Sequence, residues 1–177
     1  MRWMRATSRI AATFALLGLL LLPSPCVAQT QSPAQHKWER YTNVRFAFSI
    51  CYPSDLLIGQ GEPTNSDGQK FLSRDGRAYA AVAGIYDVLG QSFKDEYLSD
   101  IKDAQDERFK ITYRVFKQDW FVISGAGNGK IYYQKSVLFE GIIKSLWLEY
   151  PEDARADFDK ITEKMSACFH TNLPRPF

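Results

Sequence analysis

The stretch Arg45-Phe46-Ala47-Phe48-Ser49-Ile50-Cys51-Tyr52-Pro53 is the strongest fold signal in this chain. Its large side chains at positions 46, 48, 50 and 52 fall on one face of an extended strand, and the small ones at 47, 49 and 51 fall on the other. A large face and a small face predict a strand that is buried on both sides. Proline lacks a backbone N–H, so the strand should end at position 53.

Residues 1–28 have the pattern of a secretory signal peptide. Residues 1–9 carry three arginines and no acid, and residues 10–22 are almost wholly apolar. This run is too short for a membrane span of roughly 20 residues. Small residues at Cys26-Val27-Ala28 predict cleavage after Ala28. Two alternatives stay open: a retained signal anchor, and a lipoprotein in which Cys26 is acylated.

Cleavage changes the charge of the chain. The full sequence has 22 basic and 20 acidic residues; without Arg2, Arg5 and Arg9 the counts are 19 and 20, a net charge of −1. The mature chain then has no positive field for nucleic acid or an anionic membrane. We expect a periplasmic or secreted protein with no stable membrane insertion after signal cleavage.

Removing 28 of the 177 residues leaves 149, which suffice for one domain. The sequence predicts a disordered leader over residues 29–37, a single globular domain over 38–170 and a flexible tail over 171–177. Within the domain, strand patterns alternate with helical stripes at residues 91–107, where Ser92 is the expected N-cap, and 152–169. Short links favour antiparallel pairing. The predicted fold class is α+β, with two main helices on a single, mostly antiparallel sheet.

Several segments together resemble a group of uncharacterised small exported bacterial proteins with the PsbP-like α/β/α sandwich fold. They are Tyr41-x-Asn43-x-Arg45-Phe46-x-Phe48-x-Ile50-x-Tyr52-Pro53, Asn65-Ser66-Asp67-Gly68-Gln69-x-Phe71, Trp120-Phe121-Val122-Ile123-Ser124-Gly125 and Leu148-Glu149-Tyr150-Pro151. The resemblance covers residues 41–169. It implies no enzyme activity and no catalytic motif. Proteins of this fold tend to be binding or assembly factors, which is an argument by analogy.

Cys51 and Cys168 are the two cysteines that remain after signal cleavage. Cys51 lies on the small face of the opening strand, and Cys168 continues the apolar stripe Phe158, Ile161, Met165 of the last predicted helix. If that helix packs on that face, the thiols meet. An exported protein favours a disulfide; two free buried thiols, or a redox or metal role, are the alternatives.

Candidate catalytic and metal-binding residues are sparse. Ser124, His170 and Asp119 could formally make a nucleophilic triad, but Ser124 is not part of a Gly-x-Ser-x-Gly elbow. The other histidine, His36, lies in the leader. We therefore expect no catalytic, metal-binding or cofactor-binding residue and no cofactor.

Two loop motifs have simpler interpretations. Gly125-x-Gly127-x-Gly129-Lys130 departs from the phosphate-loop spacing and favours a hairpin turn between strands. The acids Glu62, Asp67 and Asp75 lack the spacing of a calcium loop, and solvated turns account for them.

Abundant aromatic residues in the second half suggest a binding surface formed by Trp120, Tyr132 and Tyr133; the alternative is core packing and cross-strand pairs. The leading functional hypothesis is a non-enzymatic exported domain that binds an envelope protein or a small ligand. A hydrolase or other enzyme with an unrecognised site is the first alternative, and a purely structural envelope-stress protein is the second.

Overall fold

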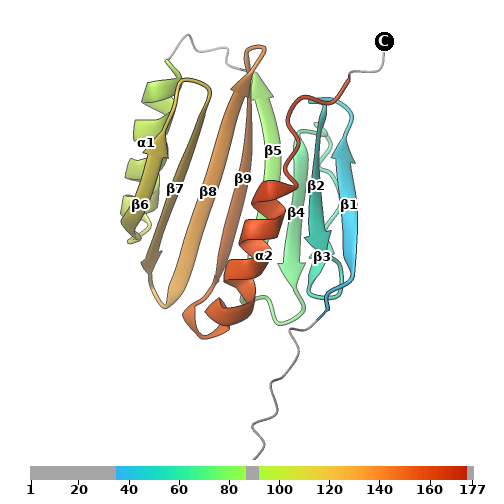
Figure 1. Ribbon diagram of the computed structural model, residues 1–177, viewed down its shortest axis with the longest axis vertical. Coiled ribbons are helices and arrows are strands. Elements are labelled where there is room, and N and C mark those ends of the chain that lie inside the picture. The colour runs from blue at the N-terminus through green and yellow to red at the C-terminus, as the bar shows by residue number, and fades with distance from the viewer. Residues whose placement is uncertain (1–34, 87–91, 175–177) are drawn as a thin grey trace, which may run out of the picture. The chain divides into compact units, whose positions relative to one another are not determined.

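Strand β9 (Ile142–Pro151) is the centre of a seven-stranded antiparallel sheet in the order β3-β4-β5-β9-β8-β7-β6 (Figure 1). The computed structural model describes residues 35–86 and 92–174. The other strands of this sheet are β3 (Leu57–Gly59), β4 (Gly68–Ser73), β5 (Tyr79–Tyr86), β6 (Lys110–Phe116), β7 (Trp120–Gly127) and β8 (Lys130–Phe139).

A second, two-stranded sheet corrects the expectation of a single sheet. It pairs β1 (Trp38–Asn43) with β2 (Phe48–Pro53). The expected opening strand begins three residues late, because Ala47 has φ 52° in the turn that precedes β2. One edge of β2 pairs with β1, and the other forms a bridge between Ser49 and His170. Both edges of β2 are thus occupied, so β2 does not join the large sheet.

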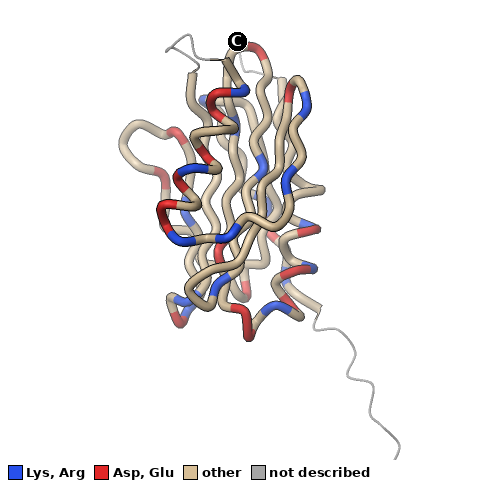
Figure 2. The backbone as a smooth tube through the Cα atoms, turned by 90° about the vertical axis from the view of Figure 1, so that its left-hand side faces the viewer, with Lys and Arg blue, Asp and Glu red and all other residues tan. Residues whose placement is uncertain are grey.

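The two helices lie on opposite sides of the large sheet (Figure 2). Helix α2 (Arg155–Ala167), preceded by the 3-10 turn η1 (Glu152–Ala154), packs on β8, β9 and β2. Helix α1 (Phe93–Asp106) packs on β6. Alternation along β9 separates the faces: Leu146 and Leu148 belong to the core beside α2, whereas Ile143 belongs to the core beside α1. The α+β class is confirmed.

Helix α1 begins where the sequence predicts. The Ser92 side chain accepts a hydrogen bond from the Asp95 backbone N–H, and the Asp95 carboxylate accepts one from the Ser92 backbone. This reciprocal capping box satisfies two backbone donors that the first turn of a helix leaves unpaired. Phe93, Ile101 and Ala104 form the buried face of the helix.

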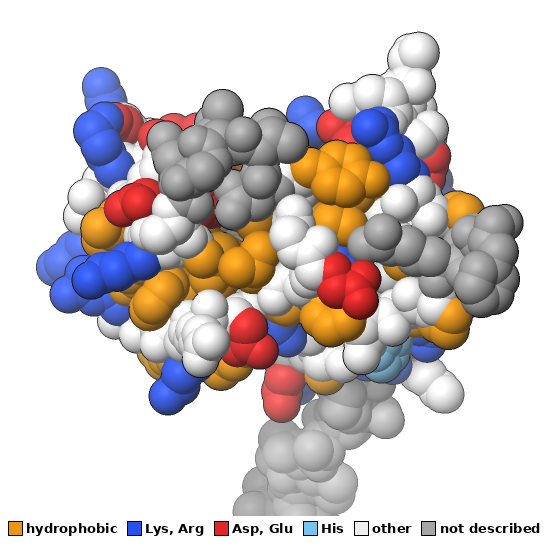
Figure 3. All heavy atoms as spheres, turned by 90° about the horizontal axis from the view of Figure 1, so that it is seen from above, with side chains coloured by type: hydrophobic (Ala, Val, Ile, Leu, Met, Phe, Trp, Pro, Cys, Tyr) orange, Lys and Arg blue, Asp and Glu red, His pale blue; other side chains and the backbone are white. Residues whose placement is uncertain are grey.

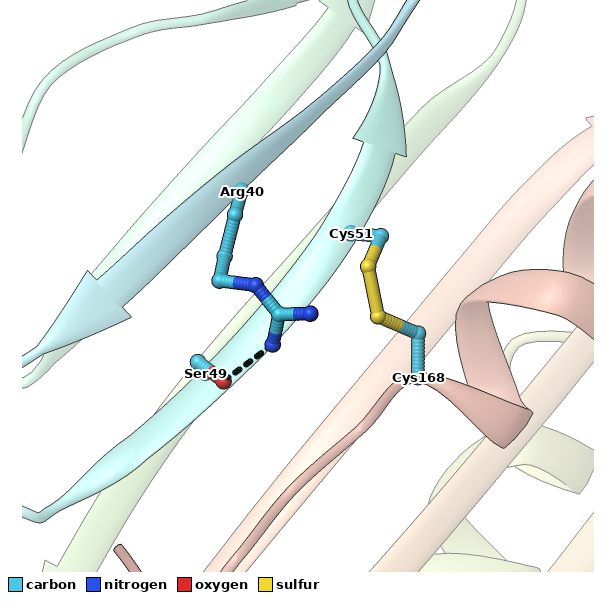
Figure 4. The surroundings of a disulfide bond; sticks show 4 residues. All are labelled: Arg40, Ser49, Cys51 and Cys168. Carbon is cyan, nitrogen blue, oxygen red and sulfur yellow. Dashed lines mark hydrogen bonds between the residues drawn. A yellow bond between two sulfur atoms is a disulfide. The ribbon is translucent and has the colours of Figure 1, made fainter.

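The predicted disulfide is present and joins β2 to the end of α2 (Figure 4). The Cα atoms of Cys51 and Cys168 lie 5.7 Å apart, a normal separation for a disulfide. Next to it, the backbones of Ser49 and His170 exchange two hydrogen bonds of 2.9 Å, and the N–H of Leu173 donates to the carbonyl of Ala47. The chain after α2 therefore follows β2 over several residues.

The predicted signal peptide, residues 1–28, lies outside the described residues. Within residues 35–86 and 92–174, no helix is both long and apolar enough to cross a bilayer.

Removing the disulfide should destabilise the domain. The bond closes a loop with a sequence separation of 117, for which the chain-entropy model gives at most about 4–5 kcal/mol. We expect reductant to lower the unfolding free energy by roughly 2–5 kcal/mol in urea titrations. A Cys51→Ala/Cys168→Ala variant should have the urea midpoint of the reduced protein, and reductant should not change that midpoint. An unchanged urea midpoint after reduction would contradict this.

Candidate functional site

The structure separates the three aromatic residues predicted to form one surface. Tyr132 and Tyr133 are neighbours on β8, so their side chains point to opposite faces of the sheet. Tyr132 faces α1, is 7% exposed and stacks on Phe109 with ring centroids 5.2 Å apart. Trp120 and Tyr133 lie on the other face, where they line a groove beside α2.

This α2 groove has a volume of about 770 Å³ and runs between α2 and the faces of β6, β7 and β8. Tyr113 is its most open aromatic residue, with 57% of its surface exposed. Two residues of β8 reach across to α2: Tyr133 Oη lies 2.8 Å from Ser166 Oγ, and Lys135 Nζ donates to the Ser166 carbonyl. The groove is thus partly closed by contacts within the domain.

Ser124, His170 and Asp119 have separate structural roles. Ser124 Oγ donates to the Tyr132 carbonyl, the backbone of His170 pairs with β2, and the Asp119 carbonyl accepts from Leu138. No hydrogen bond joins these three residues, all of which the structure describes. Likewise, the described ranges contain no group of three or more His, Cys, Asp or Glu placed to hold a metal ion.

The glycine-rich segment is a hairpin turn, as predicted. Asn128 and Gly129 both have positive φ, at 53° and 71°, which suits the tight connection between β7 and β8. Of the three turn acids, Asp75 bonds to Ser73 and Arg77 within its own hairpin. Glu62 and Asp67 instead line a second hollow on the α1 side of the sheet.

This second hollow, the α1 cleft, has a volume of about 810 Å³. It lies between α1, the loop and strand residues 60–70, and the α1-facing side of β4, β5, β9 and β8. Strand register builds its floor from cross-strand rows; in one, Lys70, Ala81, Trp147 and Gln134 lie side by side. The small side chains of Ala81 and Ala83 on β5 leave the space open.

A buried polar network forms the α1-side wall of the cleft. Gln134, which is 1% exposed, donates to the Asp100 carboxylate over 2.5 Å and to Ser136 Oγ over 3.1 Å. Its carbonyl accepts from the Tyr132 hydroxyl. Ser136 Oγ lies 2.7 Å from Ser145 Oγ. The network fixes Asp100 at the cleft, because the Gln134 amide has all its groups engaged.

Burial raises the pKa of Asp100 to about 7. The negative charges of Glu96 and Asp103 on the same helix raise this pKa further, while the hydrogen bond from Gln134 lowers it. Burial also raises the pKa of Tyr132, so its hydroxyl stays a neutral donor at physiological pH.

Glu149 supplies a carboxylate on the cleft floor. Its side chain accepts from the Tyr79 hydroxyl over 2.9 Å and pairs with Lys130 Nζ at 3.3 Å. Glu149 is 8% exposed, so its charge is held in place by these partners. Burial, followed by the charge of Glu149, raises the pKa of Tyr79.

The most informative polar residues of the cleft were missed in the sequence: Asp100, Gln134 and Glu149. A usable signal was present. Positions 134 and 136 of β8 and positions 145 and 149 of β9 share one face by period-2 alternation, and all four are polar. Polar residues facing inward on two central strands indicate either a network or a site.

No family model matches the sequence, and no curated protein is significantly similar to it. The fold is similar to that of cyanobacterial PsbP (CyanoP) from Synechocystis sp. PCC 6803, with a TM-score of 0.58 and 11% identity over 86% of this chain and 99% of that one. It is also similar to the Ran-binding protein Mog1p of Saccharomyces cerevisiae, with a TM-score of 0.54 and 10% identity over 77% and 96% of the two chains. At these identities the likeness shows the fold alone, and it confirms the PsbP-like architecture.

Asp100 should make stability depend on pH. Its pKa of about 7 lies above the value of about 3.9 expected in the unfolded chain, so the folded state binds the extra proton between these values. Stability should therefore fall as pH rises from about 4 through about 7. We expect Asp100→Asn, which keeps a hydrogen-bond acceptor, to flatten this fall by on the order of 1–3 kcal/mol in urea unfolding.

The control is Asp106→Asn on the same helix. Asp106 is exposed and pairs with Lys102, so this variant should keep the wild-type pH profile. Parallel profiles for wild type and Asp100→Asn would contradict the prediction.

Proposed function

We propose that this protein is an exported, non-enzymatic binding domain, and that the α1 cleft holds a small ligand or a projecting part of an envelope partner protein. The observation that carries the proposal is the construction of the cleft. A hollow of about 810 Å³ has an aromatic side chain, Trp147, and two polar side chains that are more than nine-tenths buried, Gln134 and Glu149, in its lining. Ligand pockets combine this range of volume with a few fixed polar groups.

Binding accounts for the cleft better than catalysis does. A carboxyl with a pKa of about 7, such as Asp100, would suit a general base, and this favours the enzyme alternative. However, the Asp100 carboxylate accepts its hydrogen bond from the Gln134 amide, and within the described residues no serine, cysteine or histidine side chain hydrogen-bonds to it. The raised pKa values of Tyr79 and Tyr132 keep both phenols neutral, so they serve as hydrogen-bond donors.

Export is supported by the pattern of residues 1–28 and by the Cys51–Cys168 disulfide, since disulfides persist in oxidising compartments. The similarity to the Ran-binding protein Mog1p is compatible with a protein-binding role, by analogy of fold. An envelope location would provide both the oxidising environment and the partner.

Filling the α1 cleft should weaken ligand binding. We expect that amide NMR, used to screen a fragment library of mixed charge, gives hits whose shift changes cluster on the cleft lining. Ala81→Phe places a ring on the cleft floor and should weaken these hits by about tenfold or more.

The matched control is Val137→Phe, which places the same aromatic ring in the α2 groove. It should leave cleft hits unchanged. Hits that cluster in the α2 groove, or that survive Ala81→Phe, would move the binding site away from the α1 cleft.

Export has its own test. Expression of the full chain should give a mature protein whose mass corresponds to a start at Gln29, recovered from the periplasm or medium. Ala28→Trp should block processing, because signal peptidases read small residues at this position. A mature protein that keeps residues 1–28 would refute cleavage, and a lipid mass on Cys26 would establish the lipoprotein alternative.

A further inference from the structure

The α1 cleft differs from the rest of the molecule in the sign of its charge. Six acidic residues and one lysine line it: Glu62, Asp67, Asp100, Asp103, Glu107, Glu149 and Lys70. Two of the acids contribute less negative charge, because Asp100 has a pKa of about 7 and Glu149 pairs with Lys130. The remaining acids still outnumber the lysine. The chain as a whole is nearly balanced, with 22 basic and 20 acidic residues. A concave site with low-dielectric walls concentrates such a field toward its interior. The cleft should therefore attract positive charge and repel anions.

The carboxylates reach the cleft from three directions. Glu62 and Asp67 come from the segment before β4, Asp103 and Glu107 come from α1, and Glu149 lies in the floor. On a convex surface such residues would be solvated and would bind nothing in particular. Here they surround a hollow, so a bound group would lie in their combined field while losing part of its hydration.

The floor of the cleft adds a second kind of contact. The half-buried indole of Trp147 lies in the row between Ala81 and Gln134, and Tyr79 lies beside Glu149 in the next row. Aromatic faces attract cations as well as apolar groups, and tryptophan does so most strongly. A small inorganic ion would leave this floor unused, and the described residues hold no cluster suited to a metal.

We propose, building on the function proposed above, that the α1 cleft binds an organic cation: an ammonium or guanidinium group attached to an apolar or aromatic body. The charged group lies beside Asp103 and Glu107 of α1, and the body lies on Trp147 and Ala81. The same chemistry is offered by a free amine and by a lysine or arginine side chain of a partner protein. The volume of the cleft accommodates either source.

Calorimetric titration of the mature, disulfide-bonded chain tests this with two matched pairs of probes. The first pair is 2-phenylethylammonium and the neutral 2-phenylethanol. The second is the capped peptide acetyl-Ala-Lys-Phe-Ala-amide and the same peptide with acetyllysine. The cation of at least one pair should bind about tenfold or more tightly than its neutral counterpart, and added salt should reduce the difference. Preference for the amine indicates a free ligand, and preference for the peptide indicates a partner side chain.

Two variants of α1 assign the effect to the cleft. Asp103→Asn removes a lining carboxylate and should weaken the cation several-fold without affecting the neutral probe. Asp106→Asn makes the same charge change on the same helix, but Asp106 pairs with Lys102 and does not line the cleft. This variant should leave the affinities of the cationic and the neutral probe unchanged. Its free energy of unfolding shows whether a substitution on α1 destabilises the domain in general.

The outcomes separate this inference from the proposed function. If cationic and neutral probes bind equally, and Ala81→Phe abolishes both, the cleft is a binding site but the preference for cations is refuted. Equal effects of Asp103→Asn and Asp106→Asn also refute it. If neither pair binds and fragment hits lie outside the cleft, both proposals fail.

Discussion

The attachment of β2 to the C-terminal end of α2 is the contact on which the arrangement of this domain depends. The Cys51–Cys168 bond and the paired backbones of Ser49 and His170 hold the strand and the helix side by side on one face of the large sheet. Phe48 and Ile50 of β2 are fully buried in the core that this face shares with α2. Burying each such side chain contributes about 1.5–3 kcal/mol, so the covalent link secures a contact that packing already favours.

This arrangement leaves the two faces of the sheet unequally covered. Seven strands at a spacing of about 4.8 Å span roughly 30 Å, whereas a helix with its side chains is about 10 Å wide. One face receives both α2 and the β1–β2 sheet, but in the part of the chain that the structure describes the other receives one helix, α1, over β6. The surface of β4, β5 and β9 beside α1 therefore stays open. The α1 cleft forms because one helix is too narrow to cover this face of the sheet. The small side chains of Ala81 and Ala83 on β5 deepen it.

The polar residues on this face of the sheet are satisfied by hydrogen bonds within the protein. Gln134 and Glu149 are nearly inaccessible as whole residues, yet each has hydrogen-bonding partners, so neither carries the cost of an unsatisfied buried group. Elsewhere the exposed apolar side chains are spread between charged ones, as at the end of the domain shown in Figure 3. Val44, Tyr86 and Phe139 are examples of exposed apolar residues. The α1 cleft combines a hollow of about 810 Å³, an aromatic floor and carboxyl groups held in place by hydrogen bonds.

The sequence by itself determined the elements and much of their pairing, because these depend on local periodicity and short links. The capping box at Ser92 and the Asn128-Gly129 turn follow from such patterns. The disulfide between Cys51 and Cys168 was expected on other grounds, because these are the two cysteines left in an exported chain. Only the tertiary structure decided that β2 belongs to a separate sheet, since this depends on which strand edges are already occupied. The tertiary structure also decided which residues meet in the α1 cleft. Asp100 and Glu149 lie far apart in the chain, and the order of the strands and the placement of α1 bring both residues to this cleft. No local sequence pattern encodes either of these.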